Sequence, residues 1–416
     1  MNLSQVNSPF IFMPAAREKI AAKHRLPSSG WLHRARRRLL KWYRHNARDL
    51  PWRRTTDPYA IWVSEIMLQQ TQVATVERYY AKFMAALPTV AALASAQEDQ
   101  VLRLWEGLGY YRRARQMHAA AKIIMAKHGG AFPNDLQTLR QLPGIGRYTA
   151  GAILSIAFDI SAPILEANTV RLLCRLLAYR GDVSGRAGQQ LLWQAAEDFL
   201  TKRGSGELNQ ALMELGSLVC TPRNPKCGEC PLRELCPTQH GGWQNQIPAP
   251  RPQPEVINVS EAAVIIFRRG KILLRKCGPA ERWSGLWDFP RFPMKQLTNK
   301  PRKQKNTIKK PSRHAGMVTP QRKIEIIERV RQMTGVIIFD AKHFATLRHS
   351  VTRFRITLDC FVAHSRKTGR LRNLAPSTNG HSEMRWIEPS SLDDYPLCVT
   401  GRRLARLWGE MIDSIS

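Results

Sequence analysis

The sequence predicts two folded domains, an all-α domain followed by an α+β domain, and three observations support this prediction. From Trp31 to about Cys236, apolar residues recur with the period of a helix, and short Gly/Pro turns separate the runs. A polar, Pro-rich stretch over residues 241–256 then has the composition of a semi-rigid linker. After the linker the period becomes that of strands, with a hairpin over residues 262–276 and another strand over residues 353–364. A helix over residues 321–335 completes the α+β pattern.

These changes of pattern also set the predicted boundaries. An irregular basic tail covers residues 1–28, and the helical domain covers residues 29–240, with a cysteine-rich loop at 220–236. The second domain covers residues 257–412. Within it lies a Lys-rich, low-complexity insertion at residues 295–320, which we expect to be disordered.

The charge of the chain predicts a polyanionic partner. The 416 residues include 64 Lys and Arg against 32 Asp and Glu, a formal net charge of +32. This excess favours nucleic acid over a membrane as the partner. No uncharged apolar run reaches the roughly 18 residues of a membrane span, and the first residues lack the pattern of a secretory signal. We therefore expect a cytoplasmic, reducing location.

Four of the eight cysteines form a cluster that predicts a metal centre. Gaps of six, two and five residues separate Cys220, Cys227, Cys230 and Cys236, and prolines between them favour loop geometry. Four thiolates suit either structural zinc or a [4Fe–4S] cluster, and the spacing alone leaves both open. No histidine lies among them, so a structural site is expected. The other four are predicted to be ordinary thiols: Cys174, Cys277, Cys360 and Cys398.

A tight turn between two helical patterns predicts a phosphate-binding hairpin. In the stretch LPGIGRYTAGAIL, residues 142–154, Gly144 and Gly146 flank an apolar Ile145. Such a turn presents backbone N–H groups at a helix N-terminus, where a phosphate binds without sequence preference.

Three further stretches and the second domain resemble one known family. Residues 50–76, 104–121 and 209–220, together with the hairpin and the cysteine loop, are similar to the MutY family of adenine DNA glycosylases within the helix-hairpin-helix superfamily. The stretches GLWDFPRF and LRHSVTRFRITL resemble the Nudix-like C-terminal module of that family. The resemblance covers the chain from Trp31 onward except the basic insertion. It implies a [4Fe–4S] cluster in the cysteine loop, with structural zinc as the alternative.

Cleavage of a glycosidic bond needs an acid and a carboxylate, and two glutamates lie in suitably different settings. Glu65 lies among apolar residues of a predicted helix, which should raise its pKa. Glu166 precedes a helix that Asn168 and Thr169 are predicted to cap, and the helix N-terminus should favour its anion. From the residues alone, each glutamate could equally be a cap or a surface charge.

The resemblance assigns roles to these residues. It implies that Glu65 protonates adenine N7, that Glu166 stabilises or attacks the sugar cation, and that Asn168 supports Glu166. Tyr148 stands where bifunctional relatives carry a Schiff-base lysine, which implies base removal without efficient strand cleavage. The family usually has Asp-Gly-Asn where this chain has Glu166, Ala167 and Asn168, so the carboxylate here has one more methylene.

The resemblance also implies DNA contacts. Gln70 and Tyr110 are expected to fill the gap left by the extruded base. Thr352 belongs to a loop, Val351-Thr352-Arg353, that replaces the Phe-Ser-His with which the family checks for 8-oxoguanine, and it keeps the hydroxyl. The helix over residues 321–335 has too few acids for a Nudix hydrolase, which favours recognition over catalysis there. The adenine pocket is expected from Trp52, Arg53 and Glu214, and phosphate contacts from Arg112, Arg113 and Arg115.

The leading hypothesis is a monomeric base-excision repair enzyme, associated with the bacterial nucleoid, that removes adenine mispaired with 8-oxoguanine or guanine in double-stranded DNA. An endonuclease III-like glycosylase/lyase acting on pyrimidine lesions is the second hypothesis. A lesion-binding protein with impaired catalysis is the third, because Glu166 and the 351–353 loop depart from the family pattern.

Overall fold

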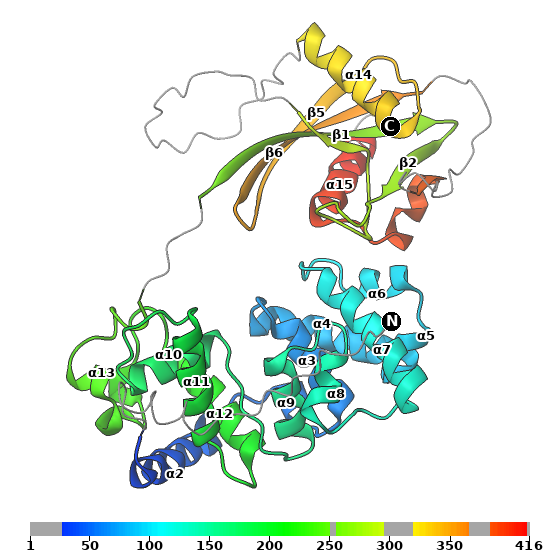
Figure 1. Ribbon diagram of the computed structural model, residues 1–416. Helices are drawn as coiled ribbons and strands as arrows, with labels where there is room; N and C mark the ends of the chain where they lie inside the picture. The colour runs from blue at the N-terminus through cyan, green and yellow to red at the C-terminus, as the bar shows by residue number, and fades with distance from the viewer. Residues whose placement is uncertain (1–26, 250–254, 295–318, 366–382, 414–416) are drawn as a thin grey trace, which may run out of the picture. The chain divides into compact units, whose positions relative to one another are not determined.

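The structure, a computed structural model, describes residues 27–249, 255–294, 319–365 and 383–413 and divides into two compact units (Figure 1). The first unit comprises Met1–Ala94 and Ala119–Pro252, and the second comprises Ser95–His118 and Gln253–Ser416. The predicted tail falls outside the described residues apart from 27 and 28, and the predicted insertion falls outside them apart from 319 and 320. Residues 250–254 of the predicted linker also lie outside them.

The first unit is helical, and among its described residues no strand occurs, as the sequence predicted. Helix α7, Arg112–His128, begins in the second unit and continues into the first. Helix α6, Glu98–Leu104, lies in the second unit. The other elements up to residue 240 are α2 Ser29–Asn46, η1 Pro51–Arg53, α3 Pro58–Leu68, α4 Val73–Ala86, α5 Val90–Ser95, α8 Leu136–Gln141, α9 Arg147–Ala157, α10 Ala167–Leu176, α11 Arg186–Asp198, α12 Ser205–Leu218, η2 Cys227–Glu229, η3 Arg233–Leu235 and α13 Pro237–His240.

Helix α3 forms the centre of this unit. Asp57 caps it by accepting hydrogen bonds from the N–H groups of Tyr59 and Ala60, and Pro58 occupies its first position, where the missing N–H costs nothing. Its residues from Tyr59 to Met67 are all buried, and it packs against α4 and α9. A helix that is apolar all round belongs in a core, so the single acid that it carries, Glu65, lies inside the protein.

The second unit contains a mixed sheet with the strand order β3-β2-β1-β6-β5, in which β4 also pairs with β1 and β7 with β2. Strands β1 and β6 are parallel, and the other pairs are antiparallel. The elements are β1 Ile257–Arg268, β2 Lys271–Lys276, β3 Trp287–Asp288, β4 Arg291–Pro293, α14 Pro320–Thr334, β5 Lys342–Val351, β6 Phe354–His364, β7 Met384–Ile387, η4 Pro389–Asp394 and α15 Val399–Asp413.

The two faces of this sheet are covered by different helices. Ala263 and Ile265 of β1 belong to a cluster with Trp408 of α15, whereas Val264 belongs to a cluster with Val330 of α14. Because both faces of β1 are buried in its central part, residues 262–267 are apolar without alternation. The predicted hairpin, strand and helix are confirmed, and the fold class is the predicted one.

No helix in the described part of the chain has the length and apolar character needed to cross a membrane.

Candidate active site

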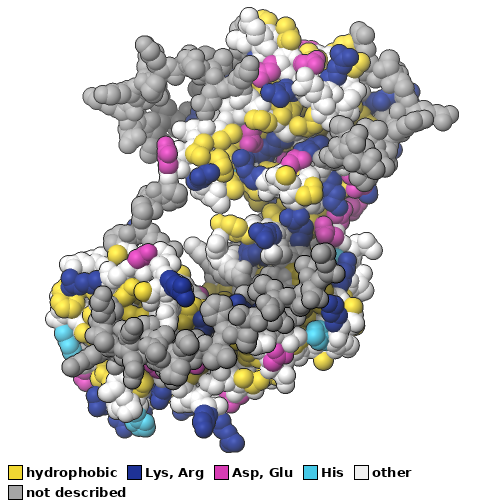
Figure 2. All heavy atoms as spheres, in the orientation of Figure 1, with side chains coloured by type: hydrophobic (Ala, Val, Ile, Leu, Met, Phe, Trp, Pro, Cys, Tyr) yellow, Lys and Arg dark blue, Asp and Glu magenta, His cyan; other side chains and the backbone are white. Residues whose placement is uncertain are grey.

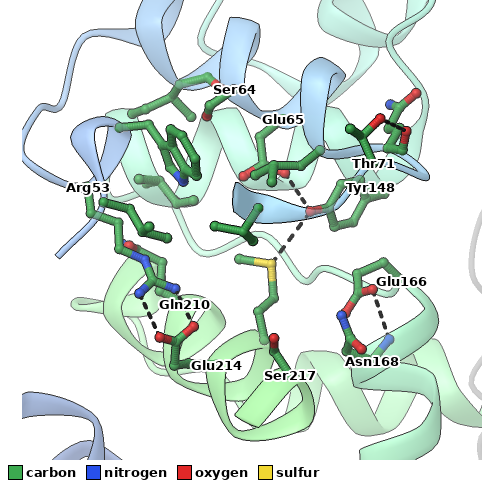
Figure 3. A pocket seen from close by; sticks show the side chains of 18 of the residues that line it. Arg53, Ser64, Glu65, Thr71, Tyr148, Glu166, Asn168, Gln210, Glu214 and Ser217 are labelled. Carbon is green, nitrogen blue, oxygen red and sulfur yellow. Dashed lines mark hydrogen bonds and ion pairs between the residues drawn. The ribbon is translucent and has the colours of Figure 1, made fainter. Parts of the chain in front are cut away.

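A cavity of about 520 Å³ in the first unit brings the predicted catalytic residues and the predicted adenine pocket together (Figure 3). Helices α3, α9, α10 and α12 supply its walls. Eight of the residues predicted from the sequence line it: Trp52, Arg53, Glu65, Gln70, Tyr148, Glu166, Asn168 and Glu214.

Glu65 is a buried acid with one oxygen engaged. Glu65 is 4% exposed, and the Tyr148 hydroxyl donates a hydrogen bond of 2.5 Å to the Oε2 atom of Glu65 (Figure 3). Burial raises the pKa of Glu65 to about 7; the hydrogen bond from Tyr148 opposes this and the charge of Glu166 adds to it. The predicted rise is confirmed. The other oxygen, Oε1, can carry a proton while Oε2 accepts from Tyr148.

Tyr148 remains a neutral phenol, because burial and the neighbouring Glu65 raise its pKa well above its ordinary value. Its hydroxyl also lies 3.5 Å from the sulfur of Met213. It is therefore a hydrogen-bond donor that orients Glu65.

Glu166 itself caps helix α10, so the prediction that Asn168 or Thr169 would be the cap was wrong. Its Oε2 accepts from the backbone N–H of Asn168 at 2.8 Å, and its Oε1 accepts from that of Thr169 at 2.9 Å. In return, the Thr169 hydroxyl accepts from the backbone N–H of Glu166, which completes a capping box. The Glu166 carboxylate is therefore folded back onto its own helix.

The pKa of Glu166 is raised, which corrects the prediction that the helix N-terminus would dominate. Burial is the largest cause, and the two backbone N–H groups and Arg171 only partly offset it. Both carboxyl oxygens nevertheless accept hydrogen bonds, which is the arrangement that an ionised carboxylate makes.

Asn168 is held beside Glu166 from the other side. Its Oδ1 accepts a hydrogen bond of 2.9 Å from Arg171, and the same guanidinium donates to the carbonyls of Gly216 and Cys220, each at 2.7 Å. A Cβ at Gly216 would lie 2.8 Å from the Cβ of Asn168, so only glycine permits α12 to approach α10 this closely.

Glu214 is the third carboxyl group of the cavity, and two arginines bind it. Arg48 and Arg53 each donate two side-chain hydrogen bonds to its carboxylate, at 2.6 to 3.0 Å, and the side chain of Glu214 is fully buried. Burial alone would raise its pKa, but the hydrogen bonds from Arg48 and Arg53 hold the pKa at about 2. It is therefore an anion at neutral pH.

Replacing Glu214 with Gln should strongly destabilise the protein. The change leaves two guanidiniums facing a buried neutral group, and removal of one partner of such a pair costs about 3–5 kcal/mol. Because its folded pKa lies below its unfolded value, Glu214 stabilises the fold above pH 4.5 and loses this contribution as the pH falls towards 2. Urea unfolding at neutral pH measures the effect.

The matched control for this prediction is Glu207→Gln on the same helix. Glu207 also pairs with an arginine, Arg44, but both side chains are partly exposed, and such a pair contributes about 0–1 kcal/mol. Equal losses in the two variants would contradict a special role for the buried pair.

Several residues that line the cavity were not predicted from the sequence, and four of them are Glu214's partner Arg48 and three residues of helix α12. Arg48 gave no local signal, because its partner Glu214 lies 166 residues away. Gln210, Met213 and Ser217 also line the cavity. With Glu214 they follow the i, i+3, i+4, i+7 spacing of one helical face, and this spacing could have identified them.

The predicted hairpin connects α8 to α9 as expected. Gly144 has φ +79°, Ile145 is 4% exposed, and Gly146 is the N-cap residue of α9 without a side-chain cap. The N-terminal N–H groups of α9 thus lie at the end of this turn.

The three residues expected to read the lesion share a backbone feature. Gln70, Tyr110 and Thr352 have φ values of 58°, 49° and 50°, and they are three of seven non-glycine residues with positive φ in the described chain. This left-handed conformation is uncommon, and for a β-branched residue such as Thr352 it is strained. Of the three, Gln70 lines the cavity, whereas Tyr110 and Thr352 belong to the second unit.

The three arginines expected at phosphates have different surroundings. Arg112 is exposed. Arg113 instead donates to the carbonyls of Leu108 and Gly109, and Arg115 donates to the Ser284 hydroxyl at 2.8 Å. Only Arg112 therefore has the free surface position that the prediction required for all three.

The four clustered cysteines line a second, smaller cavity together with Arg175. Among the residues that the structure describes, no three Cys, His, Asp or Glu side chains converge as ligands of one metal ion. Thiols placed around a cavity rather than around a point suit a multi-iron cluster better than a single zinc ion. Arg175 supports the loop by donating to the Cys220 sulfur at 3.3 Å and to the carbonyl of Thr221. The other four cysteines are buried free thiols: Cys174, Cys277, Cys360 and Cys398.

Family models match three parts of the chain. Residues 63–197 match the HhH-GPD superfamily base excision DNA repair protein, and residues 262–407 match a NUDIX domain. Residues 220–236 match the iron-sulfur binding domain of endonuclease III, which confirms the [4Fe–4S] prediction.

Comparison with complete proteins identifies the family. An alignment with the adenine DNA glycosylase of Buchnera aphidicola subsp. Baizongia pistaciae has 39% identity and covers 61% of this chain and 72% of that protein. The chain belongs to the adenine DNA glycosylase family. The adenine DNA glycosylases of rat and human are each 41% identical over 62% and 64% of this chain. Those alignments cover 51% and 50% of the two mammalian proteins, so the chain spans about half the length of these relatives.

Part of the cavity wall, including Glu65 and Glu166, lies within the HhH-GPD match, and part of it, including Glu214, lies outside that match. The predicted resemblance is confirmed for both the helical unit and the NUDIX module.

Proposed function

We propose that this protein hydrolyses the N-glycosidic bond of adenine mispaired with 8-oxoguanine or guanine in duplex DNA. The observation that carries the proposal is the pair of carboxyl groups in one cavity, Glu65 with a pKa of about 7 and Glu166 as a hydrogen-bonded acceptor. Relatives named adenine DNA glycosylase support the choice of base.

Glu65 is the proposed general acid. Its proton on Oε1 passes to adenine N7 as the bond between the sugar C1′ and N9 breaks, so that the base leaves neutral. Tyr148 stays hydrogen-bonded to Oε2 and fixes the direction of the transfer. Water then supplies hydroxide to C1′, and its remaining proton restores the acid.

Glu166 and Asn168 are proposed to face the developing sugar cation. A carboxylate whose oxygens are fixed by two backbone N–H groups is preorganised, so it stabilises positive charge without rearranging. Asn168, oriented by Arg171, lines the same cavity.

Base removal is proposed to be the whole reaction. Tyr148 occupies the position of the Schiff-base lysine in bifunctional relatives, and a phenol forms no imine with the sugar. The cysteine loop, loaded with its [4Fe–4S] cluster through Cys220, Cys227, Cys230 and Cys236, is proposed to be structural.

DNA contacts are proposed for residues of both units. On the face that Figure 2 shows, Lys and Arg side chains lie on both units. Together with the net charge of +32, they favour binding to the phosphates of DNA. Gln70 and Tyr110 are proposed to fill the gap left by the extruded adenine, and Thr352 to contact the opposite base. The protein is proposed to act as a monomer associated with chromosomal DNA.

The test is single-turnover cleavage of duplexes that carry A:8-oxoguanine, A:G or an oxidised pyrimidine. We expect abasic product from the first two and strand breaks only after alkali. Breaks at an oxidised pyrimidine without alkali would instead support the endonuclease III-like alternative. Tight binding without abasic product would support a lesion-binding protein.

The rate should also depend on pH through Glu65. Because its pKa is raised to about 7, the acid form predominates below that pH and is lost above it. The single-turnover rate constant should therefore fall as the pH rises through 7, in proportion to the protonated fraction. A rate that is unchanged from pH 6 to about pH 9 would contradict this role.

A further inference from the structure

The loop that presents Tyr110 is held by contacts within itself and belongs to the second unit. Residues Ser95–His118 group with the C-terminal module, and Tyr110 within them is 50% exposed. Trp105 donates through its indole N–H to the Gly109 carbonyl at 3.1 Å, and Arg113 donates to the same carbonyl. The Arg113 guanidinium lies over the rings of both Trp105 and Tyr110. The exposed tyrosine is thus held by the loop that carries it.

Glu106, four residues before Tyr110, is bound by the C-terminal helix α15. Arg402 donates to both oxygens of Glu106, at 2.7 and 3.1 Å, and the side chains are 11% and 9% exposed. The backbone N–H of Leu397 donates to the same carboxylate at 3.3 Å. Arg402 is itself fixed by donating to the carbonyls of Leu392 and Tyr395. Because two parallel hydrogen bonds join Arg402 to the Glu106 carboxylate and both side chains are nearly buried, the pair fixes the distance and the orientation between α15 and Glu106.

Two further residues, Asp99 and Arg115, attach the segment Ser95–His118 to other parts of this unit. Asp99 accepts from Lys276 at 2.8 Å and from the indole N–H of Trp287 at 3.1 Å. Arg115 donates to Ser284 at 2.8 Å. The segment is therefore attached before and after the loop as well as at Glu106.

We propose that Glu106 and Arg402 are positioning residues for Tyr110, through which the C-terminal module sets the position of the wedge. This inference rests on the proposed function in one respect, the role of Tyr110 beside the base opposite adenine. Only three residues separate Glu106 from Tyr110, and the hydrogen bonds to Gly109 leave the intervening loop little freedom. A shift at Glu106 is therefore transmitted to the tyrosine.

The test uses the full chain and Arg402→Lys, which keeps the charge but loses the two-pronged geometry. A 2-aminopurine placed beside 8-oxoguanine reports the unstacking produced by the wedge, and single-turnover excision is measured in parallel. We expect excision and the fluorescence change both to fall roughly tenfold in Arg402→Lys, because a displacement of about 1 Å can cost about 10²-fold in rate and the lysine still holds part of the contact. Arg403→Ala is the control, since Arg403 is the exposed neighbour on the same helix.

A double-mutant cycle with Tyr110→Ala separates positioning from folding. If the pair acts through Tyr110, adding Arg402→Lys to Tyr110→Ala changes neither signal further. Additive losses, or a loss that only follows the fraction unfolded, would overturn the proposal. Glu106→Gln, tested in the same way, provides the second variant if Arg402→Lys does not fold.

The two proposals fail in different ways. A wild-type protein that unstacks the 2-aminopurine but releases no adenine refutes the proposed function and leaves the cycle interpretable. Normal adenine release with an additive cycle refutes the positioning role alone.

Discussion

Replacing Glu65 with Gln should abolish adenine release while leaving binding of the mispaired duplex intact. Gln has the same size and still accepts a hydrogen bond from Tyr148, so the buried site is preserved. It cannot deliver a proton, and general acid catalysis contributes about 10²–10⁴-fold. Single-turnover excision and a binding titration on the same duplex measure the two properties separately.

The control for this change is Glu77→Gln on the neighbouring helix α4. Glu77 is another carboxyl in the first unit, and it does not line the cavity. Excision should be unchanged in this variant. Glu65 would lose the acid role if Glu65→Gln still released adenine within tenfold of the wild-type rate.

Replacing Glu166 with Gln should produce the second large loss, about 10²–10³-fold in single-turnover rate. The variant keeps a carbonyl oxygen for the helix cap but has no negative charge to place near the sugar cation. Glu166→Asp, in contrast, keeps the charge and is a good N-cap residue, so its rate should stay within about tenfold of wild type.

Thr169→Ala separates capping from catalysis at the same helix end. It removes the reciprocal half of the capping box and should cost about 1 kcal/mol of stability without a comparable loss of rate. If Glu166→Gln and Thr169→Ala lowered the rate equally, Glu166 would be a structural cap. Because burial raises its pKa, the wild-type rate should also fall at acidic pH as Glu166 takes up a proton.

The features that could be predicted from the sequence depend on near neighbours in the chain. The β1–β2 hairpin and helix α14 follow from residue periods, and the cysteine loop follows from spacing. The raised pKa of Glu65 was predictable for the same reason. Its own helix α3 is apolar on every side, so any packing of that helix buries it.

Other features depend on groups that are distant in the sequence. Glu166 was expected to be favoured as an anion by its helix, but the burial contributed by other elements raises its pKa more than the cap lowers it. The charge of Glu214 depends on Arg48 and Arg53, which lie more than 160 residues earlier. The segment Ser95–His118 groups with the C-terminal part of the chain, and its contacts there include that of Glu106 with Arg402, 296 residues away.

The difference between the features that the sequence predicted and those that only the folded structure revealed has one physical reason. Hydrogen bonding within a helix or hairpin and the period of its apolar face are set by residues a few positions apart, so the amino-acid order specified the elements and the burial of Glu65. Desolvation and ion pairing are set by whatever packs nearby in space. The raised pKa of Glu166, the pairing of Glu214 and the contacts that hold the loop of Tyr110 therefore became visible only when the chain was folded.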